Sequence, residues 1–217
     1  MKTCNTLDNF GYVMGDIPDD LFNKLKDECE LTDKARYLEN NDRDPMYSGI
    51  TSKGVAKHFY VKENAEELKH FVYDMFYFYE KHFNYLATCR MMSHPTNCIP
   101  TKPWINIQER GEYIPNHTHD GIMTYAIWIK IPYDINDEID YSNKNNNQST
   151  SCFEFTYPSI IGSQINKKIH LNKEWEGKIL MFPSALQHCV YPFYTSDENR
   201  ISISGMITFD TSANKPV

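Results

Sequence analysis

The chain has 217 residues, and its composition of 14% aromatic and 24% charged residues is typical of a folded globular protein rather than a disordered one. A formal net charge of −7 argues against a surface that follows the phosphate backbone of nucleic acid, so nucleic acid is not expected as a partner. No stretch approaches the ~20 apolar residues that cross a bilayer, so no membrane partner is expected. The length predicts a single domain spanning residues 1–217.

The first hundred residues are expected to form a supporting region of strand and helices. Residues 10–17 read as a short strand, and Pro18 followed by two acidic residues indicates the start of a helix. A long amphipathic helix is predicted from about Glu63 to Leu86, because apolar residues recur there at three- and four-residue steps. The aromatic stripe along this helix is interpreted as core rather than as a ligand-binding face.

From Trp104 onward the apolar period changes to two, which predicts strands. Residues 101–212 are therefore expected to form a β core, with candidate strands at 104–108, 123–131, 153–157, 165–171, 179–182, 189–194 and 201–209. A polar, asparagine-rich stretch at about 134–151 is predicted to be a mobile insertion between two strands. This pattern favours a mainly β fold, a double-sheet jelly roll buttressed by N-terminal α-helices.

The cysteines indicate a reducing environment. None of the six forms a Cys-x-x-Cys pair, and the N-terminal residues lack the basic and apolar regions of a secretory signal. We therefore expect reduced thiols and a cytoplasmic location, which is the host cytoplasm if the chain is virus-encoded.

Three histidines suggest a metal site. His117 and His119 are two residues apart, so in an extended segment their imidazoles point to one side, whereas Asp120 points to the other and is only a reserve ligand. His188, near the start of a late strand, is the third candidate. Neutral imidazole suits iron, zinc, copper or nickel, and ligand type alone does not choose between them. His58, like the other histidines outside this set, is expected to be a solvated or packed side chain.

Arg200 and Ser202 suggest a carboxylate clamp. The guanidinium offers a rigid fork that matches a carboxylate, and the Ser202 hydroxyl lies on the same face of the strand. Asn106 and Gln108 occupy a polar strand face that is expected to look into the same cavity and to bond a cosubstrate or substrate. Trp104 and Trp128 are interpreted as packing residues.

Four runs of sequence carry a resemblance to a known family. They are Trp104-Ile-Asn-Ile-Gln108, the segment from Gly111 to Gly121 that contains the His-Thr-His motif, Phe182-Pro-Ser184 with His188 and Pro192, and Arg200-Ile-Ser-Ile-Ser204. Together they resemble 2-oxoglutarate/Fe(II)-dependent oxygenases, in particular an uncharacterised, prolyl-hydroxylase-like branch from phage and marine bacteria. The resemblance covers about Trp104 to Phe209.

The resemblance implies a double-stranded β-helix with iron near its mouth. His117, His119 and His188 then correspond to metal ligands, Arg200 to the residue that grips the far carboxylate of 2-oxoglutarate, and Ser202 to its hydroxyl helper. In the family's best-known pattern an acidic residue stands where this chain has His119, which puts metal preference in question. If Asp120 supplies the acid instead, a local bulge must rotate it inward.

The expected activity is hydroxylation of an unidentified protein residue or small molecule, with molecular oxygen and 2-oxoglutarate as co-substrates and succinate and carbon dioxide as products. Two alternatives stay open. One is a cupin-like metalloenzyme in which Arg200 binds an acidic substrate directly, without 2-oxoglutarate. The other is a non-catalytic binding or structural jelly roll whose histidines are incidental.

Overall fold

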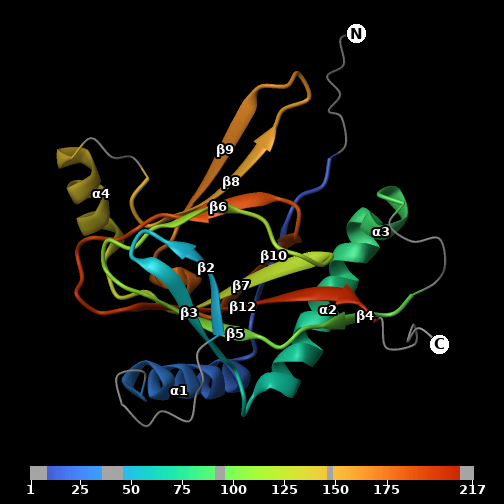
Figure 1. The fold of residues 1–217 in the computed structure, drawn as a ribbon, viewed down its shortest axis with the longest axis horizontal. Helices are drawn as coiled ribbons and strands as arrows, with labels where there is room; N and C mark the ends of the chain where they lie inside the picture. Colours follow the sequence, from blue (N-terminus) through green and yellow to red (C-terminus); the bar gives the residue numbers. More distant parts are fainter. Residues whose placement is uncertain (1–8, 36–45, 91–95, 146–148, 211–217) are drawn as a thin grey trace.

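The computed structural model describes residues 9–35, 46–90, 96–145 and 149–210. In these residues two sheets of antiparallel strands form the body of the molecule, and two long helices lie on the outer side of the larger sheet (Figure 1). The predicted mainly β fold with supporting helices is confirmed.

The larger sheet has eight strands, in the order β1-β10-β7-β12-β5-β3-β2, with β4 also paired to β12. The N-terminal strands do not form a separate sheet, because β1, β2, β3 and β4 extend the same sheet as the late strands. The bounds are β1 Val13–Asp16, β2 Met46–Thr51, β3 Gly54–Tyr60, β4 Cys98–Pro100, β5 Trp104–Gln108, β7 Met123–Lys130, β10 Lys178–Pro183 and β12 Arg200–Phe209.

The smaller sheet has four strands in the order β6-β11-β8-β9. Strands β8 and β9 continue as a hairpin that projects from the body of the molecule (Figure 1). The bounds are β6 Ile114–His117, β8 Cys152–Pro158, β9 Gln164–His170 and β11 Gln187–Val190.

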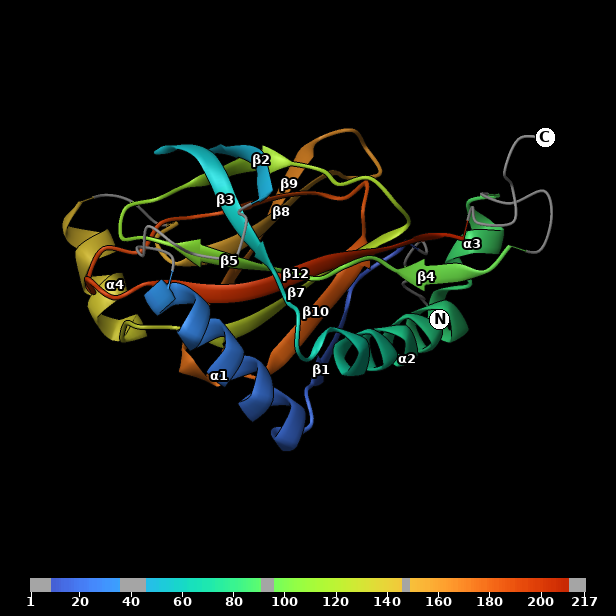
Figure 2. The same ribbon diagram turned by 60° about the horizontal axis from the view of Figure 1, so that its bottom comes forward.

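Helices α1 (Asp19–Ala35) and α2 (Ala65–Phe83) cover the outer face of the larger sheet (Figure 2). The predicted long helix corresponds to α2 and to the short α3 (Tyr85–Thr88). Asn84 separates them, because its left-handed backbone (φ 48°) ends α2. No helix within the described ranges is long and apolar enough to cross a membrane.

The larger sheet separates two apolar cores. On its outer side, residues of α1 and α2 such as Leu25 and Val72 pack against Ile127 and Ile203 of the sheet. On its inner side, between the two sheets, lies an aromatic core made of Trp128, Phe153, Phe155, Phe182 and Phe193, with apolar neighbours. The functional residues predicted from the sequence belong to this inner side.

Two segments differ from the sequence prediction. The polar stretch at 134–151, predicted to be a mobile insertion, contains helix α4 (Ile135–Lys144), although the asparagine run extends into residues 146–148, which lie outside the described part of the chain. The helix carries a buried carboxylate, Glu138, which polarity patterns count as exposed. The hairpin formed by β2 and β3 was not predicted, and it adds a wall to the inner cavity through His58 and Tyr60.

Candidate active site

The structure brings the three predicted histidines together. His117 ends β6 and lies directly opposite His188 of β11 in the antiparallel register. His119 follows two residues later, where its backbone N–H donates to the Ser184 carbonyl at 3.0 Å. One ring nitrogen from each histidine lies within 4.8 Å of those of the other two. Pairing of β6 with β11 therefore creates the cluster.

Two of the imidazoles are oriented by a backbone carbonyl two residues earlier in the chain. His117 Nδ1 lies 2.7 Å from the Pro115 carbonyl, and His188 Nδ1 lies 2.9 Å from the Leu186 carbonyl. Because a carbonyl only accepts, each Nδ1 must carry the proton, which leaves the Nε2 lone pair available to a metal. Phe153 stacks on the His188 ring at 5.5 Å and holds it from the apolar side.

Burial keeps two of the rings neutral. Burial, assisted by the neighbouring His117, lowers the pKa of His188 to about 3 and that of His119 to about 4. Neutral imidazole is the form that binds metal ions, so the cluster does not have to lose protons from these two rings near neutral pH.

Asp120, the reserve metal ligand, is exposed and lies outside the group of converging ligand atoms, although it lines the same cavity. The backbone is fixed directly afterwards, because Gly121 has φ +89° and a Cβ there would lie 2.8 Å from the Ile207 carbonyl oxygen. The neighbouring Ile122 N–H donates to that same oxygen at 2.7 Å.

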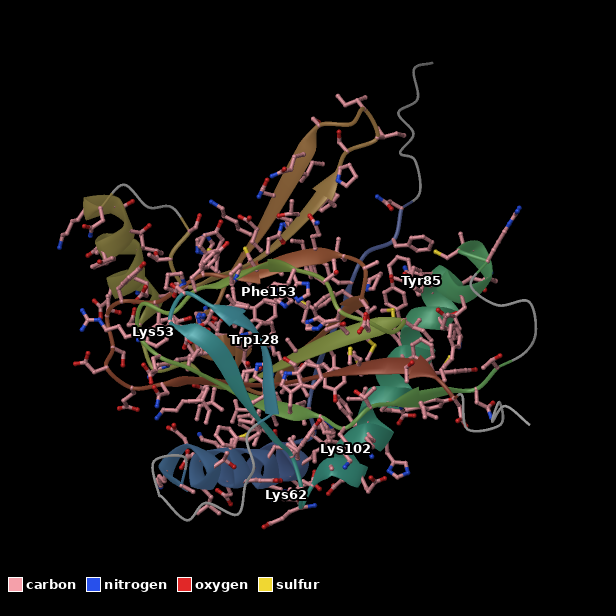
Figure 3. The ribbon with its side chains drawn as sticks, viewed as in Figure 1. Lys53, Lys62, Tyr85, Lys102, Trp128 and Phe153 are labelled. Atoms are coloured by element: carbon pink, nitrogen blue, oxygen red, sulfur yellow. The ribbon has the colours of Figure 1, made fainter. Side chains whose placement is uncertain are left out.

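A single cavity of about 980 Å³ connects the histidine cluster to the predicted carboxylate clamp. Trp128 and Phe153 lie between the two sheets (Figure 3) and line this cavity, with their ring centroids 5.9 Å apart. Trp128 is thus a packing residue, as predicted, and also a wall of the cavity. Trp104 is another wall, and its ring lies 6.0 Å from that of His119.

Arg200 lies at the inner end of the cavity and is 2% exposed. Nε and Nη2 both donate to the Gln108 side-chain oxygen (3.2 and 2.6 Å), Nη2 also donates to the Tyr191 carbonyl (2.7 Å), and Nη1 donates to the Tyr133 hydroxyl (3.0 Å). All these partners are neutral, and no described carboxylate pairs with the guanidinium. One of its five N–H groups, on Nη1, has no acceptor among the described residues.

Asn106 and Ser202 lie side by side on β5 and β12. The two Nδ2 hydrogens of Asn106 are directed to the hydroxyl oxygens of Ser204 (2.9 Å) and Ser202 (3.4 Å), and Asn106 Oδ1 accepts from the Trp104 indole (3.1 Å). The Asn106 amide thus orders the cavity wall, while the Ser202 hydroxyl keeps its own proton to donate.

Sequence reasoning missed His58 as a cavity residue. His58 pairs with Asn106 across β3 and β5, lines the cavity, and stacks on Trp104 with ring centroids 6.0 Å apart. Burial, assisted by His117, lowers its pKa to about 4. The signal was the alternation of His58 and Tyr60 with the buried Phe59 at the end of the seven-residue strand β3.

Comparisons with known proteins agree with this geometry. The model of the family described as "Putative 2OG-Fe(II) oxygenase" matches residues 102–205. Among solved structures, a Pseudomonas putida prolyl-4-hydroxylase has a TM-score of 0.56 at 12% identity, over 92% of each chain. The α-ketoglutarate-dependent carbocyclase SnoK from nogalamycin biosynthesis has a TM-score of 0.51 at 13% identity, over 93% of this chain and 80% of that one. A search of curated protein sequences found no match.

At these identities the solved structures establish the jelly-roll fold alone, and the narrower phage and marine bacterial branch stays a prediction. The matched family uses Fe(II) and 2-oxoglutarate. The matched segment runs from the start of β5 into β12 and contains all three histidines, Arg200 and Ser202. Over residues 102–205 the chain is thus similar to the 2-oxoglutarate/Fe(II) oxygenase family.

Proposed function

We propose that the chain is an iron- and 2-oxoglutarate-dependent dioxygenase that hydroxylates a primary substrate and converts 2-oxoglutarate to succinate and carbon dioxide. One observation carries the proposal. The same cavity holds three converging imidazoles and, at its inner end, a buried guanidinium without a carboxylate partner among the described residues.

The residues present fit a divalent metal. His117, His119 and His188 would hold Fe(II), since their nitrogens lie within 4.8 Å of one another and an ion about 2 Å from each needs separations under roughly 4 Å. A small rotation of the rings would bring the three nitrogens to the separation that a metal ion needs. Three ligands from the protein leave positions open for a cosubstrate and oxygen. Because an imidazole ligand adds no charge, the double charge of the ion favours an anionic cosubstrate.

The residues at the inner end fit the distal carboxylate of 2-oxoglutarate. The free Nη1 hydrogen of Arg200 and the Ser202 hydroxyl proton are donors on this wall, and a buried guanidinium without an anion gains most from a carboxylate. Asn106 contributes by holding Ser202 and Ser204 in place. We assign Asn106 to the cosubstrate site in this supporting sense.

The chemistry of the bound iron and 2-oxoglutarate is oxidation by molecular oxygen, with one oxygen atom entering succinate and the other entering the C–H bond of the substrate. The protein positions and shields this reaction. Phe153 and Phe182 flank His188 with ring centroids at 5.5 and 4.8 Å, so they exclude water from one side of the centre.

The cavity has room for more than the cosubstrate. We propose that its outer part, bordered by His58, Tyr60 and Trp104, receives the primary substrate, which is either a protein residue or a small molecule. We also propose that the protein is cytoplasmic, as the cysteine spacing predicts.

The test is 2-oxoglutarate binding and turnover by the purified chain. Calorimetry with metal-loaded protein should show stoichiometric 2-oxoglutarate binding, and aerobic incubation with Fe(II) should release succinate. Metal uptake with activity indifferent to 2-oxoglutarate would favour a cupin-like enzyme instead. Absence of metal uptake would favour a non-catalytic jelly roll.

A further inference from the structure

Helix α4, between β7 and β8, contains a carboxylate that is removed from solvent. Glu138 is 0% exposed although the surrounding helix is polar. The helix begins at a regular cap, where the Asp134 side chain accepts from the Asn136 N–H at 2.7 Å. A buried carboxylate is costly unless donors satisfy it, so the partners of Glu138 show what the helix holds.

The three shortest of the hydrogen bonds to Glu138 come from the segment that leads to Arg200. Glu138 Oε1 accepts from the Tyr194 N–H (2.8 Å), the Thr195 N–H (2.7 Å) and the Thr195 hydroxyl (2.6 Å). Oε2 accepts from the Ser151 hydroxyl at 3.4 Å. No cation pairs with this carboxylate in the part of the chain that the structure describes. Glu138 therefore fastens one loop by its backbone.

The fastened segment, residues 191–195, encloses the guanidinium. The Tyr191 carbonyl accepts from Arg200 Nη2 at 2.7 Å, and the Phe193 ring lies 5.4 Å from the guanidinium carbon. Phe193 also stacks on Tyr133 at 5.1 Å, and the Tyr133 hydroxyl accepts from Arg200 Nη1. Tyr133 directly precedes the α4 cap. The guanidinium thus sits in a cage whose two sides are joined by α4.

We propose that Glu138 is a positioning residue for Arg200, and that α4 sets the affinity for the anionic cosubstrate. This inference rests on the proposed function, because it assumes that Arg200 binds the distal carboxylate of 2-oxoglutarate. The physical reason is preorganisation: an arginine already locked against Tyr133 and Tyr191 loses little conformational entropy when the carboxylate arrives. If α4 no longer holds residues 191–195, the arginine side chain must lose conformational entropy on binding, and the affinity for the carboxylate falls.

The chain offers a matched control in Glu28 of α1. Glu28 is 2% exposed and likewise holds backbone N–H groups, those of Lys62 (2.7 Å), Glu63 (3.2 Å) and Asn64 (3.3 Å). It fastens the start of α2, on the outer side of the larger sheet, and within the described ranges its carboxylate bonds none of the residues that surround Arg200. Its removal should cost stability in the same way without touching the cosubstrate.

The experiment compares Glu138→Ala, Glu138→Gln, Thr195→Val and Glu28→Ala with the parent chain. Each protein is loaded with Mn(II), and calorimetry gives the Kd for the metal and then for 2-oxoglutarate, with Tm recorded for each. We expect Glu138→Ala to raise the 2-oxoglutarate Kd about 10- to 100-fold and to leave the metal Kd unchanged. Glu138→Gln, which keeps the accepting oxygen, should restore most of the affinity.

The outcomes separate this inference from the proposed function. If the parent chain does not bind 2-oxoglutarate, the proposed function fails. If the parent chain binds it and Glu138→Ala binds equally well, or if Glu28→Ala weakens binding as much, the positioning role is wrong. Should Glu138→Ala fail to fold, Thr195→Val decides, because it removes one hydroxyl bond to Glu138 and is expected to raise the 2-oxoglutarate Kd several-fold. An unchanged Kd in that variant overturns the inference.

Discussion

The two ends of the cavity are built in different ways. At the metal end, His117 and His188 are each oriented by a carbonyl two residues earlier in the chain, and one strand pair brings them together. At the inner end, Arg200 depends on Gln108 of another strand, on Tyr133, and on a loop held by α4. The metal end is a local motif, whereas the inner end is assembled from distant segments. Changes to one should therefore leave the other intact.

Loss of a metal ligand should have the largest effect. His188→Ala is expected to weaken Mn(II) or Fe(II) binding by more than about 100-fold, since even residues that only orient metal ligands are worth 10- to 100-fold. Succinate release should disappear with it. His70→Ala is the control, because His70 is exposed on α2 and bonds only its own helix. Metal uptake by His188→Ala equal to that of the control would remove His188 from the ligand set.

Loss of the guanidinium should act on the opposite end alone. Arg200→Ala is expected to cost about 2–5 kcal/mol of 2-oxoglutarate binding, the range for truncating one partner of a buried charged pair. Turnover at physiological cosubstrate concentration should be abolished, while metal affinity and the far-UV spectrum stay as in the parent chain. A parallel loss of metal affinity would show that the two ends are not independent.

Acid should weaken the metal end before the Arg200 end. His58, His119 and His188 have pKa values lowered to about 4, 4 and 3, against 6.5 for an exposed histidine. The unfolded chain therefore takes up these protons first as pH falls below about 6.5, and stability drops until the folded rings titrate between about pH 4 and 3. By pH 5 each ring should have lowered the free energy of unfolding by about 2 kcal/mol. Urea unfolding of the metal-free chain at stepwise pH measures this.

The matched variant for this titration is His58→Leu. It removes one of the three histidines, so the fall in stability between pH 6.5 and 5 should become shallower by about a third. The groups around Arg200, which are Gln108, Tyr133 and the Tyr191 carbonyl, do not titrate in this range. An unchanged slope in the variant would contradict the assignment of a neutral, buried His58.

The smallest effects are expected outside both ends. Gly205 lies against the buried Tyr125 hydroxyl, which has no hydrogen-bond partner among the residues that the structure describes, and a Cβ at Gly205 would overlap it. Gly205→Ala should destabilise the fold by about 1–3 kcal/mol, and Tyr125→Phe in the same chain should relieve part of this loss. Tm measures both, and neither the metal Kd nor the 2-oxoglutarate Kd should change. A change in either Kd would mean that stability alone perturbs the site.

The sequence predicts the metal end better than the inner end for a physical reason. The spacing of His117 and His119 in an extended segment is local, and the late strands carry a clear period of two, so both can be read from neighbouring residues. Tyr133, Phe193 and Glu138 act through contacts between segments far apart in the chain, which no local period reports. Glu138 is the clearest case, because a carboxylate in a polar segment reads as exposed, yet it is 0% exposed.

Gly121 has a consequence for redesign of the metal centre. Because the Ile207 carbonyl leaves no space for a side chain there, the chain cannot slide by one residue to exchange His119 for Asp120 as a ligand. An engineer who wants a carboxylate at the centre must therefore introduce it at residue 119. His119→Asp keeps the backbone register and replaces a neutral nitrogen donor by a charged oxygen donor, so it asks whether the imidazole selects one transition metal over another.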